Sequence, residues 1–203
     1  TVASLAFSAC GTYLASSGKY RWLCIWKRAG AGVGTGIEED QFSLAWAQDA
    51  AHRRIIWSVH FCPWQSNCLV SGSRDGCIKV WQLQSIGDDS ETTATVLHSF
   101  APVFTLHGKP DAVTALSLRP TPYRPGVALL AVGLESGHLE IWTIPTTAES
   151  GAAPPTCLIS SHHGHRATIT KLAWKPQRDA SSSAELLASS SMDHGVRIWK
   201  IQC

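Results

Sequence analysis

The chain has 203 residues, 44% of them hydrophobic and only 16% charged, and its formal net charge is +2. Because soluble domains usually carry roughly 25% charged residues, we expect a surface of Ser, Thr, Gly and backbone, which is typical of an all-β protein with many turns. The near balance of 17 basic and 15 acidic residues excludes a polybasic tail that binds nucleic acid or anionic lipid by charge alone.

The sequence also lacks membrane and secretion signals. Its longest uninterrupted apolar stretch, around Val127 to Leu134, is far shorter than the roughly 20 residues of a membrane span, and no signal peptide follows Thr1. The seven cysteines include no Cys-x-x-Cys pair and are predicted to be reduced thiols. We therefore expect a soluble protein without membrane contact. The single methionine, Met192, predicts that the chain is a piece of a longer one.

Tryptophans mark an internal repeat. Trp26, Trp81, Trp142 and Trp199 lie 55, 61 and 57 residues apart, and each follows a leucine by twelve positions. The four segments align without gaps as LASSGKYRWLCIW, LVSGSRDGCIKVW, LAVGLESGHLEIW and LASSSMDHGVRIW. Each is an apolar run, a turn of small residues, and then an alternation of apolar and polar positions, which predicts a β-hairpin.

One further strand is predicted before each hairpin, and another after the first three. In chain order the preceding strands read VASLAFS from Val2, IWSVHFC from Ile56, VTALSLR from Val113 and ITKLAWK from Ile169. The following strands are expected near Phe42 to Ala47, Val96 to Phe104 and Cys157 to Ser160. Three units of four strands and a last unit of three are therefore predicted. On this count the final outer strand and the ring closure come from residues before Thr1.

Units of four short strands, each closed by Trp, resemble the WD-repeat family. The resemblance implies an all-β fold, a β-propeller, with about four blades of an incomplete larger ring. We predict a single WD-repeat sector over residues 1–203, with blades at approximately 1–47, 48–104, 105–161 and 162–203.

The family resemblance implies a buried relay of His, Ser, Asp and Trp that staples a blade. Two blades match it completely, with His52, Ser71, Asp75 and Trp81 in one and His165, Ser189, Asp193 and Trp199 in the other. The first and third blades depart from it, with Tyr20 and Ser136 in the Asp column and Lys109 in the His column of the third blade. We expect those two blades to depend more on apolar packing.

The relay residues also suggest two kinds of chemistry. Ser, His and Asp form the triad of acyl transfer, but their repetition beside a Trp favours a structural role, so we predict no catalytic residue and no enzyme. Clustered imidazoles such as His162, His163 and His165 can ligate a metal, yet His165 belongs to the relay and no acidic or thiol ligand is suitably spaced. We therefore expect no metal and no cofactor.

Basic residues flank the relay on loops that gather on one face of a propeller. They are Arg53, Arg54, Arg74, Lys109 and Arg166. Because Arg binds carboxylate or phosphate with a forked geometry, these residues are candidates for binding an acidic partner surface or an RNA backbone. The alternative is a set of solvated arginines and an internal ion pair.

The phrases RIIW and AVGLESG do not contain the relay residues of the family pattern, and they resemble the C-terminal blades of the WD-repeat subunits of the Elongator complex. That resemblance implies a non-catalytic scaffold that supports the modification of wobble uridines in tRNA. The implied partners are the large propeller subunit and the radical-SAM acetyltransferase-like catalytic subunit, with indirect or weak contact to tRNA. The implied compartments are the cytoplasm and also the nucleus. The alternative is a generic WD-repeat adaptor, such as a ubiquitin-ligase substrate receptor that binds acidic or phosphorylated peptides.

Overall fold

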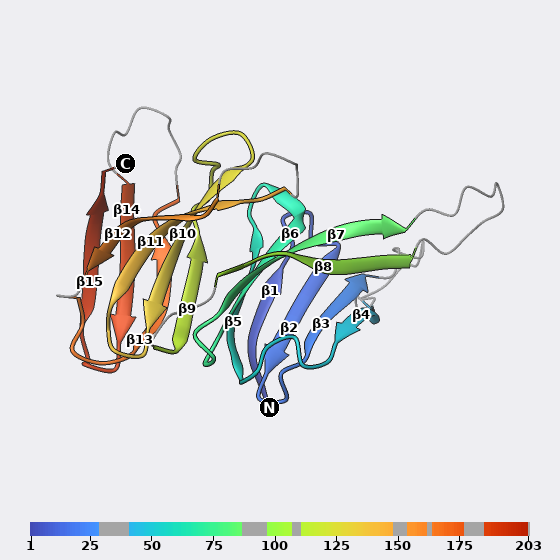
Figure 1. The fold of residues 1–203 in the computed structure, drawn as a ribbon, viewed down its shortest axis with the longest axis horizontal. Helices are drawn as coiled ribbons and strands as arrows, with labels where there is room; N and C mark the ends of the chain where they lie inside the picture. The colour runs from blue at the N-terminus through green and yellow to red at the C-terminus, as the bar shows by residue number, and fades with distance from the viewer. Residues whose placement is uncertain are drawn as a thin grey trace, which may run out of the picture.

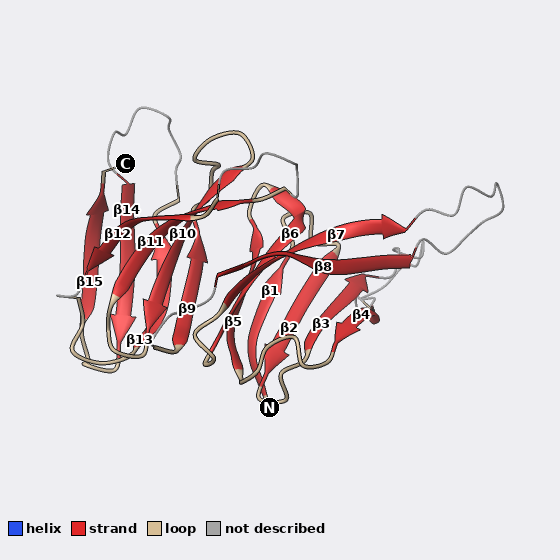
Figure 2. Cartoon of the chain, viewed as in Figure 1, coloured by secondary structure: helices blue, strands red, loops and turns tan. Residues whose placement is uncertain are grey.

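The computed structural model describes residues 1–28, 41–86, 97–106, 111–147, 154–161, 164–176 and 185–202. Fifteen strands in this part of the chain form four antiparallel sheets that stand side by side (Figure 1). Strands and the loops between them make up all of it, as Figure 2 shows. The described residues include no helix with the length and apolarity that a membrane crossing demands.

Each sheet is one blade, and its strands pair in chain order. Blade 1 consists of β1 (Val2–Phe7), β2 (Tyr13–Gly18), β3 (Leu23–Arg28) and β4 (Phe42–Gln48). Blade 2 consists of β5 (Ile56–Cys62), β6 (Gln65–Ser73), β7 (Ile78–Ile86) and β8 (Leu97–Leu106). Blade 3 consists of β9 (Val113–Leu118), β10 (Val127–Leu134), β11 (Leu139–Pro145) and β12 (Thr156–Ser161). Blade 4 consists of β13 (Ile169–Trp174), β14 (Glu185–Ser191) and β15 (Val196–Ile201).

The predicted fold class is confirmed: the protein is all-β, and its four blades are arranged as in a β-propeller. The sheets extend slightly past the predicted blade ranges, because β4 ends at Gln48 and β8 ends at Leu106. The first strands β1, β5, β9 and β13 lie next to one another in that order. They form the inner edge along which the blades succeed each other.

Neighbouring blades pack face to face through apolar side chains that recur at the same positions in each blade. Between blades 2 and 3, for example, Val70 and Val80 of blade 2 meet Val113 and Leu130 of blade 3, and all four are fully buried. Blades 1 and 2, and blades 3 and 4, form equivalent cores. Because burial of apolar area is the main favourable contribution to folding, these three interfaces hold the sector together.

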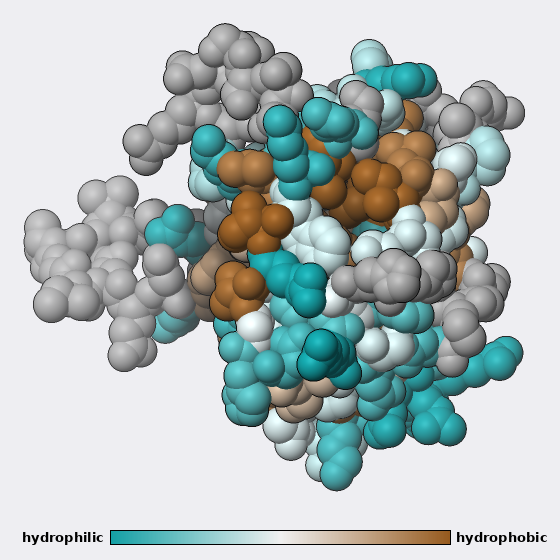
Figure 3. Space-filling model, turned by 90° about the vertical axis from the view of Figure 1, so that its left-hand side faces the viewer, coloured by the Kyte–Doolittle hydropathy of each residue, from teal (hydrophilic) through white to brown (hydrophobic). Residues whose placement is uncertain are grey.

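The outward faces of the first and last blades expose apolar positions that the inner blades bury. In blade 1, Val2, Leu5 and Phe7 are 62–63% exposed, whereas the matching residues of blade 2, Ile56, Val59 and Phe61, are at most 4% exposed. Blade 4 exposes Met192, Val196 and Ile198. Figure 3 views the side of the molecule that carries β15 and shows apolar residues gathered on it. The end blades thus present surfaces of the kind that the inner blades bury.

Every inner strand contains a β-bulge at its second residue. The pairing with the next strand skips Ala3 in β1, Trp57 in β5, Thr114 in β9 and Thr170 in β13. A bulge leaves one residue out of the ladder and turns its side chain in a new direction. The residue at this position is small or hydroxylated in three blades and is a tryptophan in blade 2.

Candidate functional site

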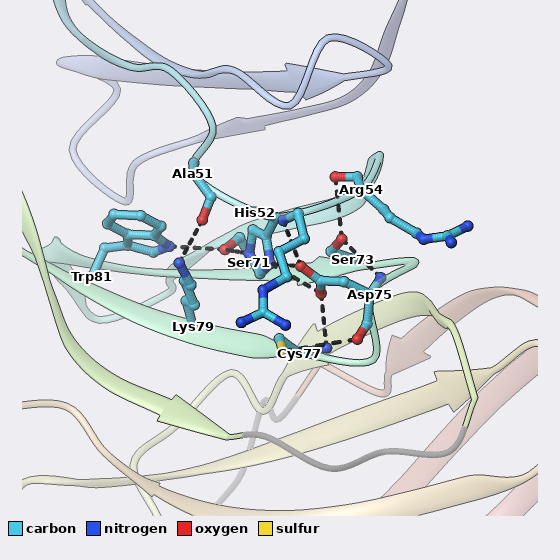
Figure 4. A network of polar contacts seen from close by, with 10 residues as sticks. Ala51, His52, Arg54, Ser71, Ser73, Asp75, Cys77, Lys79 and Trp81 are labelled. Carbon is cyan, nitrogen blue, oxygen red and sulfur yellow. Dashed lines mark hydrogen bonds and ion pairs between the residues drawn. The ribbon is translucent and has the colours of Figure 1, made fainter.

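In blade 2 the four predicted relay residues form one hydrogen-bonded chain (Figure 4). Trp81 Nε1 lies 2.8 Å from Ser71 Oγ, His52 Nε2 lies 2.7 Å from the same oxygen, and His52 Nδ1 lies 3.3 Å from both carboxylate oxygens of Asp75. An indole nitrogen only donates and an ionised carboxylate only accepts, so with a neutral imidazole between them the direction of this series of hydrogen bonds is fixed. Trp81 donates to Ser71, the Ser71 hydroxyl donates to His52 Nε2, and His52 Nδ1–H donates to Asp75.

Asp75 joins the hairpin turn of blade 2 to the loop that precedes β5. Its carboxylate accepts hydrogen bonds from the backbone N–H of Arg53 (2.7 Å) and of Cys77 (2.9 Å). Burial acts to raise the pKa of Asp75, but the hydrogen bond and charge of His52 and these two N–H groups outweigh it and hold the pKa well below its usual value. Burial also lowers the pKa of His52, which favours the neutral imidazole that this chain of donors requires.

Blade 4 repeats the arrangement. Trp199 Nε1 and His165 Nε2 each lie 2.8 Å from Ser189 Oγ, and His165 Nδ1 lies 3.0–3.1 Å from the carboxylate oxygens of Asp193. The backbone N–H groups of Arg166 (2.9 Å) and Gly195 (2.8 Å) also donate to Asp193. The Arg166 N–H contributes most to holding the pKa of Asp193 below its usual value.

Of these hydrogen bonds, blade 1 keeps only the one between the tryptophan and the serine. Trp26 Nε1 donates to Ser16 Oγ at 2.9 Å, while Tyr20, which stands in the Asp column, is 72% exposed. The tryptophan and the serine therefore stay paired where the Asp column has lost its carboxylate.

Blade 3 replaces the relay with other polar contacts. Val132 fills the Ser column and is fully buried, so Trp142 Nε1 donates instead to Glu140 Oε2 at 2.7 Å. Asp111 accepts the backbone N–H of Ser136 at 2.6 Å and so holds the hairpin turn from the preceding loop. The expectation that this blade depends on apolar packing missed these two carboxylates. Lys109, which stands in the His column, lies outside the described residues.

The relay has the hydrogen-bond connectivity of a hydrolytic triad, but a substrate cannot reach its serine. Ser71 is fully buried and Ser189 is 2% exposed, and each hydroxyl oxygen already accepts a hydrogen bond from an indole. A nucleophilic serine must reach a substrate carbonyl beside an oxyanion hole. The arrangement therefore fixes loops and leaves no room for attack on a substrate.

Three of the five predicted basic residues come together on blade 2. Arg53, Arg54 and Arg74 are exposed; the Arg74 N–H donates to the carbonyl of Ile55 at 3.0 Å, and Ser73 Oγ donates to that of Arg54 at 3.3 Å. Arg166 is exposed on blade 4, away from this group. Lys109 was the fifth residue of this set, and its position is not described.

The described residues contain no group of three or more His, Cys, Asp or Glu side chains placed to hold a metal ion. Of the histidine cluster considered for metal binding, His165 is part of the relay, and His162 and His163 lie outside the described residues.

Repeated antiparallel blades, two of which carry a Trp–Ser–His–Asp chain, define a WD-repeat propeller. The family model "WD domain, G-beta repeat" matches residues 1–27, 44–82 and 156–200, and the chain belongs to this family. The strands β9, β10 and β11 of blade 3 lie outside the matched residues, in line with the loss of Ser and Asp from that blade.

The chain is similar over nearly its whole length to proteins named Elongator complex protein 2, which confirms the resemblance seen in the sequence. The protein of Dictyostelium discoideum is 28% identical over 211 residues, which cover 100% of this chain and 22% of that protein. The human protein is 28% identical over 213 residues (99% and 25%), and that of Saccharomyces cerevisiae is 30% identical over 145 residues (70% and 16%). The chain thus spans about a quarter or less of these relatives.

Proposed function

We propose that this chain is part of a non-catalytic scaffold subunit of the Elongator complex, which supports the modification of wobble uridines in tRNA through protein–protein contacts. The observation that carries the proposal is the similarity to Elongator complex protein 2 along nearly the whole chain in relatives from Dictyostelium discoideum to Homo sapiens. The partners we propose are the large propeller subunit and the radical-SAM acetyltransferase-like catalytic subunit.

The stiffness of the blades supports a scaffolding role. In blades 2 and 4 the carboxylates of Asp75 and Asp193 tie the loop before the inner strand to the hairpin turn. Loops that are ordered before a partner arrives lose less conformational entropy on binding. The buried serines of the relay, which are shielded from any substrate, support the non-catalytic part of the proposal.

Arg53, Arg54 and Arg74 are the partner contacts that we propose on blade 2, and Arg166 marks a separate contact on blade 4. Any contact with tRNA through these arginines is weak or indirect. We propose that the protein acts in the cytoplasm and also in the nucleus.

Affinity purification of the tagged protein from its source cell tests this function. We expect the other Elongator subunits to co-purify with it, and we expect less of them after joint charge reversal by Arg53→Glu, Arg54→Glu and Arg74→Glu. Charge reversal at Lys175, Arg197 and Lys200 is the matched control. Recovery of cullin-ligase components in place of Elongator subunits would contradict the proposal and favour a ubiquitin-ligase substrate receptor.

A further inference from the structure

Trp57 occupies a position that the fold gives to small residues. It is the bulge residue of β5, and the matching residues are Ala3, Thr114 and Thr170. Thr114 Oγ1 donates to the carbonyl of Ile169 at 2.6 Å, and Thr170 Oγ1 to that of Ser190 at 3.1 Å, so the two threonines serve the fold. Trp57 is 40% exposed, and within the described residues its indole N–H has no hydrogen-bond acceptor.

Two of the proposed contact arginines lie beside Trp57. Ile56 pairs with Ser73, and the Arg74 N–H donates to the carbonyl of Ile55. The segment from Arg54 to Trp57 therefore runs alongside Arg74 at the end of the hairpin. The side chain of Arg54 extends away from His52 and Asp75, as Figure 4 shows. No carboxylate of the described residues pairs with the guanidinium groups of Arg53, Arg54 or Arg74.

The charge around Trp57 is positive on balance. The carboxylate of Asp75 is engaged by His52 and by two backbone N–H groups, so it is directed inward. Blade 1 adds Arg21, whose carbonyl accepts the N–H of Ala51 at 3.0 Å in the loop before Arg53. The exposed carboxylate nearby in sequence is Asp49, which accepts the N–H of Ala50. An approaching anionic group therefore meets several cations against the exposed carboxylates of Asp49 and, on the neighbouring turn of blade 3, Glu135.

We propose that Trp57, Arg54 and Arg74 form a binding site for an acidic polypeptide segment that carries an aromatic or large apolar side chain. The segment packs this side chain on the indole, and its carboxylates accept forked hydrogen bonds from the two guanidinium groups. The indole N–H donates to a backbone carbonyl or a carboxylate of the segment. Trp and Arg are the residue types that most often dominate the binding energy of protein interfaces. This site rests on the proposed scaffold function and names the chemistry of one of its partners.

The surroundings favour a polypeptide over an RNA strand. Binding of single-stranded nucleic acid uses several aromatic platforms in series along a basic groove. Here one exposed indole belongs to the segment that carries Arg54 and runs alongside Arg74, and the exposed aromatics next to Arg21, Tyr20 and Trp22, line a separate pocket of blade 1 with Val2 and Gly18. The neighbouring hairpin turn of blade 3 presents Glu135, which is exposed. The cationic surface is therefore bounded by an acidic residue on the side of blade 3, which suits a short peptide segment.

Equilibrium binding of the full chain to three probes tests the proposal. The probes are a random copolymer of glutamate and tyrosine, polyglutamate, and oligouridylate, all measured at an ionic strength of about 0.15 M. We expect the copolymer to bind at least about tenfold more tightly than polyglutamate, as an anchoring aromatic contact implies. Oligouridylate is expected to bind more weakly than the copolymer.

Trp57→Thr is the matched variant, because threonine is the natural bulge residue of blades 3 and 4. It is expected to lower affinity for the copolymer to that for polyglutamate and to leave the melting temperature unchanged. Joint reversal of Arg54 and Arg74 to Glu should abolish binding of both acidic probes, whereas reversal of Arg197 and Lys200 should not.

Copolymer binding that Trp57→Thr leaves intact would overturn the proposal, as would tighter binding of oligouridylate or no binding of either acidic probe. The proposed function fails separately. If the predicted binding pattern is found but no Elongator subunit co-purifies, the scaffold assignment alone is wrong. If the subunits co-purify and Trp57→Thr has no effect, the peptide site alone is wrong.

Discussion

Blades 2 and 3 are both flanked by other blades, and they solve the same structural problem with different residues. Blade 2 links Trp81 to Asp75 through Ser71 and His52. Blade 3 carries Val132 in place of the serine, so the indole N–H of Trp142 donates to Glu140. Asp111 accepts a hydrogen bond from the hairpin turn of this blade. The requirement common to both blades is a partner for the indole N–H and a carboxylate that joins the turn to the preceding loop.

The two solutions differ in where the polar groups lie. Trp81, Ser71 and His52 are at most 2% exposed, so each must keep its partner, because an unpaired polar group in the interior costs free energy. In blade 3 the contacts of Trp142 and Asp111 are only partly buried or are exposed, and water can replace a lost partner. Blade 2 is therefore expected to be the more sensitive of the two to substitution.

The largest effect is expected for Ser71→Val, which places the residue of blade 3 into blade 2. The change strands His52 Nε2 and Trp81 Nε1 in the core, and it should lower the free energy of unfolding by about 2–5 kcal/mol. Urea denaturation followed by circular dichroism measures this. The reciprocal change Val132→Ser strands only one hydroxyl and should cost less. Equal stability of Ser71→Val and the parent chain would show that the relay contributes nothing.

Asp75→Ala should lower the free energy of unfolding by about 1–3 kcal/mol, because His52 and two backbone N–H groups lose their acceptor. Asp193→Ala should lower the stability of blade 4 in the same direction. Thermal unfolding checks both variants. An unchanged melting temperature together with loss of a hydrolytic activity would instead make the relay a catalytic triad.

Asp111→Ala tests the substitute contact of blade 3 and should cost only about 1 kcal/mol, because the turn that it holds is exposed. The backbone N–H of Ser136 loses its acceptor, so its hydrogen exchange should quicken. That of Cys77 in blade 2 should not change. Equal acceleration at both amides would show that the two turns are coupled and not held separately.

Acidification should weaken blade 2 more than blade 3. Burial lowers the pKa values of His52 and His60 in the folded protein, so the unfolded chain takes up protons first as the pH falls through about 6.5. The stability from these two groups is complete above that pH and declines below it. The pKa of Asp75 is lowered too, but its contribution is lost only below about pH 4.

A melting temperature that falls between pH 7.5 and pH 5 is the expected result. The effect is the smallest of the four, because attraction to the Asp75 carboxylate offsets part of the cost of charging His52. His60→Ser gives blade 2 the residue type that blade 3 has at this position, Ser117. This variant should show a smaller fall in melting temperature. An identical pH profile in this variant would exclude His60 as a contributor.

The positions of the strands could be predicted because apolar residues recur at the same positions of each repeat. Leu69 and Leu130 precede Trp81 and Trp142 by the same interval, and each pair lies directly opposite across a hairpin. A β-sheet imposes this periodicity on any sequence that folds into it. The relay residues of blades 2 and 4 could be identified for a related reason, since they stand at fixed distances from the closing tryptophan.

The substitutes in blade 3 and the bulge at Trp57 could not be predicted from the same pattern. Asp111 and Glu140 lie outside the relay columns, so nothing in the spacing distinguishes them from solvated carboxylates. A bulge adds one residue that does not follow the alternation, so the strand pattern that begins at Ile56 does not distinguish Trp57 from its neighbours. The only available signal was its size, at a position where the other units have Ala or Thr.

The sheet order of blade 4 has a practical consequence for handling the protein. Among the strands that the structure describes, β15 pairs with β14, whereas β3, β7 and β11 each also pair with an outer strand. Within the described residues the outer edge of β15 has no strand partner, and in the isolated chain this edge, with exposed Val196 and Ile198, is a template for uncontrolled strand addition between molecules. A lysine at position 198 is the simplest protection against such aggregation, because charged edge residues keep strands apart.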